Sequence, residues 1–156
     1  MNTKLKENTK IQLFTCKAVY TKETLDISLF YNTQILIYFW AIECEYCTSE
    51  LIKLSTLSNT YKENTKFIYI NCGDTEEEII NFITKNSQKL QLNINNISEK
   101  IYSDYNDNIT SLLNIENIPT TLIIKKNLII NNILVGKNKI EKYKNLLEKN
   151  LEQPKN

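Results

Sequence analysis

The residues best suited to chemistry lie in one short stretch, ILIYFWAIECEYCTSEL, from Ile35 to Leu51. Cys44 and Cys47 have the spacing Cys-x-x-Cys, and a carboxylate, Glu50, follows three residues after the second sulfur. Two cysteines at this spacing can form a redox-active disulfide, a static disulfide or half of a zinc site. The rest of the sequence narrows these alternatives, because it lacks most other reactive side chains.

Histidine and arginine are absent from the chain. Without histidine, catalysis by Cys–His or Ser–His–Asp groups and mixed Cys/His zinc sites are excluded. Without arginine, there is no bidentate clamp for phosphate. A zinc site of four thiolates would need Cys16 and Cys72, which are isolated on predicted strands. The predicted chemistry is therefore disulfide exchange, without a metal or other cofactor.

The chain has 156 residues and a net charge of +1, which is typical of one globular domain. It has no long basic stretch that would indicate a nucleic-acid partner, and no window approaches the roughly 20 apolar residues of a membrane span. The first ten residues are polar, so no signal peptide is predicted, although an export segment could have preceded them. We expect a monomer with a flexible segment at 1–10, a domain at 11–150 and a flexible tail at 151–156.

Hydrophobic periodicity predicts the elements that must position the cysteines. Gln34–Trp40 is a nearly continuous apolar run, which predicts a central strand buried on both faces. A helix is predicted from about Glu45, because Leu51, Leu54 and Leu57 recur at helical spacing. The other predicted elements are a strand pair at 10–14 and 25–29, a strand at 66–72, a helix at 74–86 that opens with a capping box at Thr75 and Glu78, a loop at 87–99, a short strand at 100–105, a short helix at 108–114, a hairpin at 120–135 and a helix at 138–150. This order predicts an α/β fold with a central mixed β-sheet flanked by helices.

The cysteine pair falls at the junction between the predicted central strand and the predicted helix. Cys44 would lie at the helix N-terminus, where free N–H groups and the helix dipole lower the pKa of a thiol. Cys47, one turn later, would be more buried and within reach of the Cys44 sulfur. We therefore expect Cys44 to be the nucleophile and Cys47 to resolve the mixed disulfide. Two ordinary cysteines or a static disulfide are the alternative.

Motifs along most of the chain resemble the thioredoxin superfamily, and within it the TlpA/ResA-like thiol–disulfide oxidoreductases. The match runs from about Ile11 to Leu147 and includes Phe39–Trp40–Ala41 ahead of the cysteines. Glu50 falls on the acidic position of the family's Cys-x-x-Cys-x-x-Glu. NIENIPTTLII resembles the segment that carries the family's cis-proline, here Pro119, and Gly136 matches the glycine before the last helix.

The resemblance implies a thioredoxin fold with an N-terminal β-strand pair and an enzyme that reduces protein disulfides by dithiol–disulfide exchange. Its partners would be a protein disulfide substrate and an upstream dithiol protein that donates electrons, with no bound cofactor. Such proteins serve cytochrome c maturation or redox homeostasis of the cell envelope, which implies a periplasmic or envelope location, with the cytoplasm as the alternative. The alternative functions are a disulfide oxidase or isomerase on the same fold, a non-catalytic thioredoxin-fold adaptor, and a copper-handling protein that uses the same two cysteines, against which the lack of histidine argues.

The resemblance also implies roles for residues around the disulfide. Cys44 and Cys47 would form the redox-active disulfide, and Glu50 would shuttle a proton for Cys47. Pro119 would face the disulfide, so that the backbone of Ile118 could pair with an extended substrate segment. Trp40 would pack beside the site rather than contact substrate. The residues expected to support the site or bind substrate are Trp40, Glu45, Tyr46, Ile118, Pro119 and Thr120.

Four positions depart from the family pattern, and they bear on the substrate more than on the chemistry. Glu43 and Tyr46 stand where the family has a tryptophan and a proline beside the cysteines. Ile52 replaces a proline that kinks the helix, and Tyr38 replaces the acid that thioredoxin itself carries in the central strand.

Three carboxylates, those of Glu43, Glu45 and Glu50, surround the two sulfurs in the sequence. A nearby negative charge raises a thiol pKa and makes the dithiol the better reductant, whereas the helix dipole acts in the opposite direction. The carboxylates favour a reductase, unless Glu43 and Glu45 are solvated loop charges. Cys16 and Cys72 are expected to be buried free thiols, with a second disulfide as the alternative if their strands are neighbours.

Overall fold

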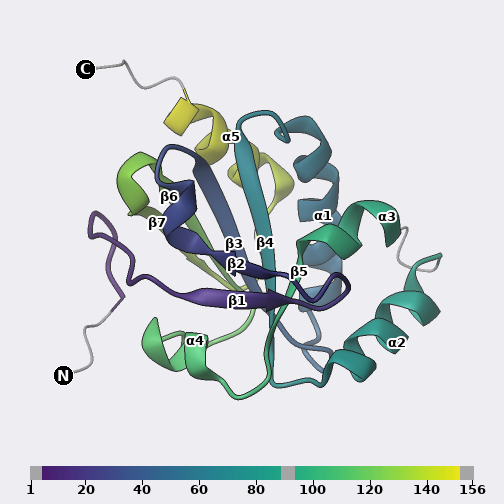
Figure 1. The fold of residues 1–156 in the computed structure, drawn as a ribbon. Coiled ribbons are helices and arrows are strands. Elements are labelled where there is room, and N and C mark those ends of the chain that lie inside the picture. Colours follow the sequence, from purple (N-terminus) through teal and green to yellow (C-terminus); the bar gives the residue numbers. More distant parts are fainter. Residues whose placement is uncertain (1–4, 89–93, 152–156) are drawn as a thin grey trace.

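The computed structural model describes residues 5–88 and 94–151, which contain one seven-stranded sheet with helices on both faces (Figure 1). The strands lie in the order β2-β1-β5-β4-β3-β6-β7. They are β1 (Thr15–Ala18), β2 (Thr24–Asp26), β3 (Gln34–Trp40), β4 (Thr65–Cys72), β5 (Ile101–Asp104), β6 (Thr120–Lys125) and β7 (Ile129–Val135). The predicted α/β class, with a central mixed sheet flanked by helices, is confirmed.

Strand β3 lies inside the sheet, between β4 and β6. It pairs in parallel with β4 and antiparallel with β6, in the registers Trp40↔Asn71 and Phe39↔Thr120. All seven of its residues are buried, as expected for an apolar strand covered on both faces. Because β6 runs antiparallel to β3, the residues that follow Trp40 lie at the same edge of the sheet as those that precede Thr120.

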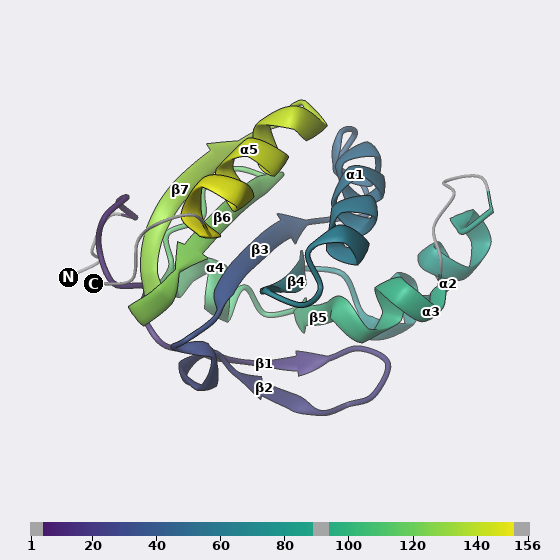
Figure 2. The same ribbon diagram turned by 90° about the horizontal axis from the view of Figure 1, so that it is seen from above.

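The helices are α1 (Cys47–Thr60), α2 (Glu76–Asn86), α3 (Ile94–Ile97), α4 (Asn108–Leu112) and α5 (Ile140–Leu151). The view from above shows α1 and α5 on one face of the sheet and α4 on the other (Figure 2). Side chains alternate along β3 and so supply both faces. One core cluster, which includes α1 and α5 side chains, takes Leu36, Tyr38 and Trp40, and the opposite cluster takes Ile35, Ile37 and Phe39.

Local sequence explains how α1 and α2 are built. α1 buries the predicted leucine stripe and continues without interruption past Ile52, where the family has a kinking proline. The predicted capping box of α2 is present: the Thr75 hydroxyl accepts from the Glu78 N–H, and the Glu78 carboxylate accepts from the Thr75 N–H. No helix within the described residues is long and apolar enough to cross a membrane.

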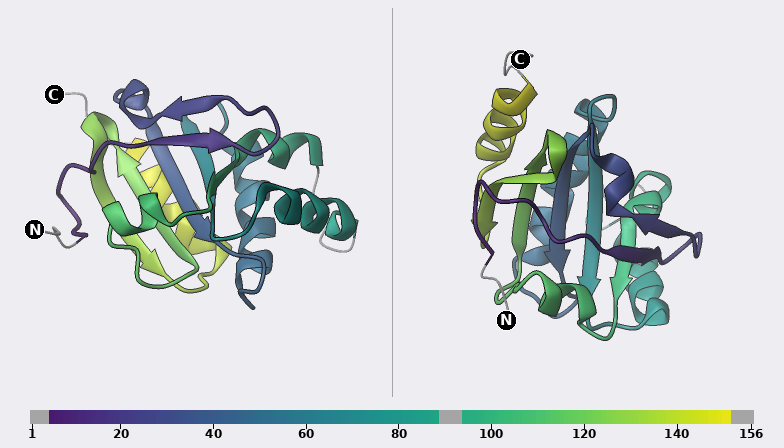
Figure 3. Two further views of the ribbon diagram at one scale, coloured as in Figure 1. Left: turned by 60° about the horizontal axis from the view of Figure 1, so that its bottom comes forward. Right: turned by 60° about the vertical axis from the view of Figure 1, so that its left-hand side comes forward.

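The N-terminal strand pair is present, but its first strand begins later than predicted. Residues 10–14 form no regular strand; Lys10 makes one isolated bridge with Ile129 of β7, and the chain then crosses toward β1 (Figure 3). Ile11 and Phe14 are both buried in the core although they are three residues apart. A regular strand, whose side chains alternate with a period of two, would point these two residues to opposite faces.

Two other predicted boundaries also differ. Strand β2 ends at Asp26, because the Asp26 carboxylate accepts from the Ser28 N–H at 3.0 Å and starts a short 3₁₀ helix, Ile27–Phe30. The predicted loop 87–99 contains α3 and the start of a 3₁₀ turn, Ser98–Lys100, because Ile97 is fully buried in the core. Residues 89–93, and residues 1–4 and 152–156 of the predicted flexible ends, lie outside the described residues.

Candidate active site

Cys44 and Cys47 form a disulfide in the segment that joins β3 to α1. Their Cα atoms are 5.3 Å apart, which is within the usual range for a disulfide. Cys47 is fully buried, whereas Cys44 is partly exposed. A thiol of another molecule can therefore approach the Cys44 sulfur but not the Cys47 sulfur.

A turn outside helix α1 carries Cys44. The Cys44 N–H donates to the Ala41 carbonyl at 3.3 Å, and the Cys47 N–H donates to the Cys44 carbonyl at 3.3 Å. Helix α1 then begins at Cys47, with Tyr46 as its N-cap residue. The helix begins two residues later than the predicted start at about Glu45, because turns occupy the segment before Cys47. Cys44 is therefore close to the N-terminus of α1 without being part of the helix.

The Ile118–Pro119 peptide bond is cis, as the resemblance implied. Pro119 directly precedes β6, at the sheet edge where β3 ends, and its carbonyl accepts from the Gly136 N–H at 2.8 Å. The Thr120 hydroxyl donates to the Asn117 carbonyl, which closes the loop on its other side. The side chain of Ile118 is 38% exposed. This loop therefore presents an accessible residue at the sheet edge that also carries the disulfide.

Glu50 is fully buried, and three groups bind its carboxylate. The Lys53 ammonium donates to Oε1 at 2.6 Å. The Asn138 N–H donates to Oε2 at 3.2 Å, and the Tyr143 hydroxyl donates to the same oxygen. Lys53 also donates to the Asn138 carbonyl at 2.9 Å. Glu50 therefore joins α1 to α5 and to the loop between β7 and α5, in addition to lying one turn after Cys47.

Two tyrosines lie in the same part of the core as Glu50. The Tyr38 hydroxyl donates to the Cys47 carbonyl at 2.6 Å and so connects β3 to the start of α1. Burial, with a smaller contribution from the Glu50 charge, raises the pKa of Tyr38. Burial also raises the pKa of Tyr143, and its hydrogen bond to Glu50 acts in the same direction. Both phenols therefore stay neutral and act as hydrogen-bond donors.

The remaining predicted residues divide between surface and core. Glu43 and Glu45 are exposed, so water screens their charges. Tyr46 is 44% exposed, and the Lys137 ammonium lies 4.6 Å from its ring centroid. Trp40 is fully buried and packs against Phe82, with ring centroids 6.1 Å apart. Of the three glutamates, only Glu50, which lies in α1 one turn after Cys47, is buried in the core.

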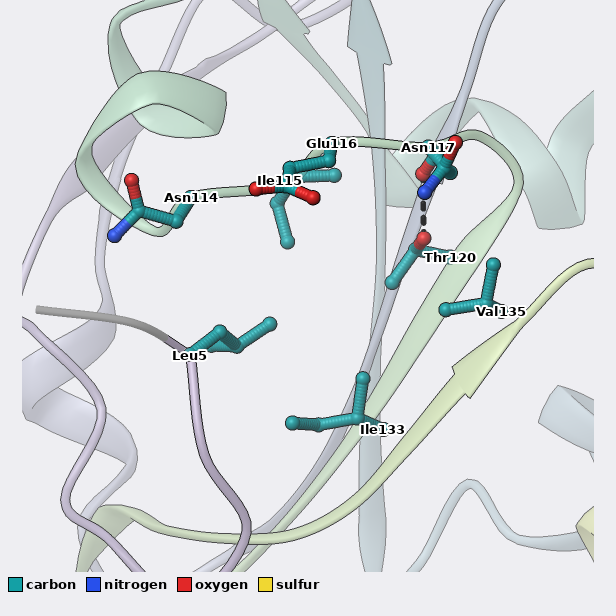
Figure 4. A pocket seen from close by; sticks show the side chains of 8 residues that line it. All are labelled: Leu5, Asn114, Ile115, Glu116, Asn117, Thr120, Ile133 and Val135. Carbon is teal, nitrogen blue, oxygen red and sulfur yellow. Dashed lines mark hydrogen bonds between the residues drawn. The ribbon is translucent and has the colours of Figure 1, made fainter.

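A hollow of about 480 Å³ opens beside the Pro119 loop (Figure 4). We call it the β7 hollow; it is lined by residues 114–117 and by Leu5, Thr120, Ile133 and Val135. Figure 4 shows Ile133 and Val135 of β7 on one side and the 114–117 segment across from them. Val135 is 60% exposed. The hollow therefore presents apolar side chains to solvent next to the loop that carries Ile118.

Cys16 and Cys72 are free thiols, and the second disulfide is not formed; Cys16 is buried as expected, whereas Cys72 is only partly buried. Their strands, β1 and β4, are not neighbours, because β5 lies between them. Burial is the main cause that raises the pKa of each thiol to about 12, and the Asp104 charge adds to it. Among the described residues, no group of three or more histidine, cysteine, aspartate or glutamate side chains could hold a metal ion.

Several residues that contact the site were not among those predicted from the sequence. Lys53 and Asn138 hold Glu50, and Asp74 accepts a hydrogen bond from the Ile42 N–H at 2.9 Å, two residues before Cys44. Asn71, a polar residue that directly follows the apolar residues 67–70 of β4, was the one local signal for a polar contact near this loop. Nothing in the local sequence indicates the partners of Lys53 or Asn138.

The site joins a Cys-x-x-Cys disulfide after a central strand to a cis-proline before the neighbouring antiparallel strand. With helices on both faces of the sheet, these features define the thioredoxin-like thiol–disulfide oxidoreductases as a class. A family model described as thioredoxin-like matches residues 32–130, and the chain belongs to this family. The resemblance to the thioredoxin superfamily is thereby confirmed. No curated protein matches the chain in sequence.

Solved structures share the fold over most of the chain. A thiol:disulfide interchange protein of the thioredoxin family from Chlorobium tepidum has a TM-score of 0.73 and 15% identity, and the match covers 94% of this chain and 98% of that one. A secreted Mycobacterium tuberculosis disulfide oxidoreductase, homologous to E. coli DsbE, has a TM-score of 0.70 and 14% identity, and the match covers 87% of this chain and 95% of that one. StoA from Bacillus subtilis has a TM-score of 0.69 and 19% identity, and the match covers 87% of this chain and 96% of that one. These structures confirm the predicted thioredoxin fold.

Proposed function

We propose that the chain reduces disulfides of other proteins by dithiol–disulfide exchange. The observation that carries this proposal is the pairing of a partly exposed Cys44 with a fully buried Cys47 in one disulfide. An asymmetric pair of this kind lets one sulfur meet the substrate while the other is kept for the second step. Both steps use only these two thiols, so no bound cofactor is required.

The reaction starts from the reduced protein. The Cys44 thiolate attacks one sulfur of the substrate disulfide, and the other substrate sulfur leaves as a thiolate and takes a proton from water. Cys47 then loses its proton and attacks the Cys44 sulfur, which forms the Cys44–Cys47 disulfide and releases the second substrate thiol. The substrate gains two electrons and two protons. An upstream dithiol protein returns the electrons by the same exchange in reverse.

Glu50 supports the second step in this proposal. Its buried charge, one helical turn from Cys47, disfavours another negative charge on the Cys47 sulfur. The reduced pair is then a stronger reductant, because the dithiol gains less stabilisation from ionisation of a thiol. In the second step, the Glu50 carboxylate accepts the proton that Cys47 loses. Tyr38 holds the Cys47 backbone in place through its hydrogen bond to the Cys47 carbonyl.

The exposed groups near the disulfide favour an extended polypeptide as substrate. Ile118 offers its backbone for pairing, and Tyr46 adds exposed apolar surface. The β7 hollow lies two strands from β3, which is about 10 Å at the usual strand spacing. An extended chain advances about 3.3 Å per residue, so a substrate side chain about three residues from the reacting cysteine would reach the hollow. We assign the hollow to an apolar side chain of the substrate.

The reduction potential tests the direction of the reaction. We expect a value near that of thioredoxin, about −270 mV, rather than that of a strong oxidant, about −120 mV. The protein is equilibrated with dithiothreitol or glutathione buffers, and the oxidised fraction is read by alkylation and mass spectrometry. Cys44→Ser should abolish reduction of a protein disulfide and serves as the control. A potential above about −200 mV would overturn the reductase assignment.

A disulfide oxidase or isomerase is the second candidate. The observation in its favour is the exposure of Glu43 and Glu45, because screened charges contribute little to the pKa of the thiols. The reducing direction then depends mainly on Glu50. The secreted oxidoreductase among the structural neighbours supports a cell-envelope location, where either activity would serve redox homeostasis or cytochrome c maturation.

A further inference from the structure

The turn that carries Cys44 is attached to a neighbouring part of the sheet through Asp74. The Ile42 N–H, inside this turn, donates to Oδ2 of Asp74 at 2.9 Å. The same oxygen accepts from the Asn71 side-chain amide at 2.9 Å, and the Asp74 N–H donates to Oδ1 of Asn71 at 3.1 Å. Asn71 and Asp74 therefore hold each other by two hydrogen bonds, and their shared carboxylate oxygen holds Ile42. We call these three residues the Asp74 clamp.

Rigid elements fix both ends of this clamp. Asn71 is fully buried in β4 and lies opposite Trp40 in the register with β3. Gly73 has a φ of +90°, a left-handed conformation that lets the chain turn back toward β3 directly after the strand. The residue after Asp74 is the N-cap of α2. The carboxylate thus has little freedom to follow the turn if the turn moves.

We propose that Asp74 is a positioning residue for Cys44. A hydrogen bond from a backbone N–H to a carboxylate is among the stronger hydrogen bonds in proteins. Here it adds to the 3.3 Å hydrogen bond from the Cys44 N–H to the Ala41 carbonyl, which closes the turn. The clamp acts through Ile42 and keeps the Cys44 sulfur where it can both meet a substrate and return to Cys47. This role gives the proposed disulfide exchange a positioning residue outside the Cys-x-x-Cys segment.

Three variants separate positioning from general stability. Asp74→Ala removes the acceptor; Asp74→Asn keeps one carbonyl oxygen that can accept from both Ile42 and Asn71. Thr75→Ala removes the neighbouring cap of α2 and leaves the clamp intact, so it is the matched control. The readouts are the rate of Cys44 alkylation against pH in the reduced protein, resolved by mass spectrometry, and the reduction potential. Urea unfolding measures stability in parallel.

For Asp74→Ala we expect Cys44 alkylation to slow by about tenfold, because a rate change of this size is typical of losing one charge-assisted hydrogen bond. The reduction potential of the Cys44–Cys47 pair should shift as well. Asp74→Asn should slow Cys44 by about threefold, between the wild type and Asp74→Ala, because a neutral acceptor makes a hydrogen bond about half as strong as a carboxylate does. Thr75→Ala should lose stability with neither readout changed. If Asp74→Ala does not fold, Asp74→Glu, which displaces the carboxylate, takes its place with the same expected slowing.

Three results would overturn the proposal. One is a Cys44 rate in Asp74→Ala that matches the wild type. Another is a slowing of Cys44 in Asp74→Asn equal to that in Asp74→Ala, which would indicate that the charge of Asp74, rather than its hydrogen bond, affects Cys44. The third is an equal defect in Thr75→Ala, which would indicate general loosening. These readouts concern Cys44 itself, so the clamp can be confirmed even if the wild-type protein fails to reduce protein disulfides and the proposed function falls.

Discussion

At the scale of single residues, Cys44 and Cys47 differ in access to solvent although they are three residues apart. Cys47 is fully buried, and its carbonyl accepts from the Tyr38 hydroxyl. Cys44 lies in a partly exposed turn. Thiol–disulfide exchange requires access to the attacked sulfur, so burial supports Cys44 as the residue that meets the substrate.

Alkylation of the reduced protein tests these roles. Cys44 should react with iodoacetamide near neutral pH about tenfold faster than Cys47, because its sulfur is accessible and lies near a helix N-terminus. Cys16 and Cys72 should also lag, because their thiol pKa values are raised to about 12. Mass mapping of the labelled peptides gives the order of reaction. Labelling of Cys47 ahead of Cys44 would contradict the assignment.

Glu50→Gln tests whether the buried carboxylate acts on the thiols. The variant keeps the shape of the side chain but removes the charge, so the apparent thiol pKa should fall, the dithiol should become less reducing and turnover should slow. Thiolate absorbance against pH measures the pKa. Tyr143→Phe is the control: it removes one donor to Glu50 and should lower the free energy of unfolding by about 2 kcal/mol, with little change in the thiol titration. An unchanged titration and turnover in Glu50→Gln would make Glu50 a purely structural acid.

At the scale of elements, β7 is an edge strand that is covered along its first part only. The Asn8 N–H donates to the Ile130 carbonyl at 2.7 Å, and the Ile130 N–H donates to the Thr9 carbonyl at 2.8 Å. The other end of β7 reaches Val135, which is exposed, and the next N–H binds the Pro119 carbonyl. The end of this strand therefore lies beside the cis-proline loop and forms one side of the β7 hollow.

Val135→Asp tests whether the β7 hollow takes an apolar side chain of the substrate. The variant should lower kcat/KM about tenfold for a peptide disulfide with a leucine or phenylalanine three residues from its cysteine, because a charge replaces apolar contact surface. Reduction of a small disulfide such as hydroxyethyl disulfide should not change. Asn132→Asp, which adds the same charge on the opposite face of β7, is the matched control. Equal rates for apolar and polar peptides in the wild type would rule out this use of the hollow.

At the scale of the whole molecule, the sheet separates reactive from unreactive cysteines. Cys44 and Cys47 follow β3 at one edge of the sheet, whereas Cys16 is buried in the core cluster on the face opposite α1 and α5. Burial there favours the neutral thiol and raises the pKa of Cys16 to about 12. The fold thereby keeps this thiol protonated at the pH where Cys44 is expected to react.

The raised pKa of Cys16 should make the free energy of unfolding depend on pH. The unfolded chain releases this proton near pH 9, and the native protein holds it until about pH 12, so the unfolded state binds fewer protons in this window. The free energy of unfolding of the oxidised protein should therefore fall as pH rises from about 9 to about 12. Urea unfolding measures it, and Cys16→Ala should make the fall less steep. Leu25→Ala, at the position paired with Cys16, is the control and should lower the free energy of unfolding equally at every pH. If both variants made the fall with pH less steep, the pH dependence could not be assigned to Cys16.

The sequence determined the elements whose signals are local. The apolar run Gln34–Trp40 predicted β3, the pair Thr75 and Glu78 predicted the cap of α2, and the hairpin at 120–135 was placed correctly. The Cys-x-x-Cys spacing predicted the disulfide. These features depend on residues close together in the chain, so periodicity and spacing are sufficient to predict them.

Only the tertiary structure decided which carboxylates belong to the core and what holds the Cys44 turn. The residues around Glu43, Glu45 and Glu50 in the fold cannot be read from the local sequence: the first two glutamates are exposed, whereas Glu50 is buried among Lys53, Asn138 and Tyr143. Two of these partners are 88 and 93 residues away, and Asp74 is 32 residues from Ile42. A buried charge is stable only where such partners meet it. Packing of α5 against α1 brings Tyr143 and Asn138 to Glu50, and the turn between β4 and α2 brings Asp74 to Ile42.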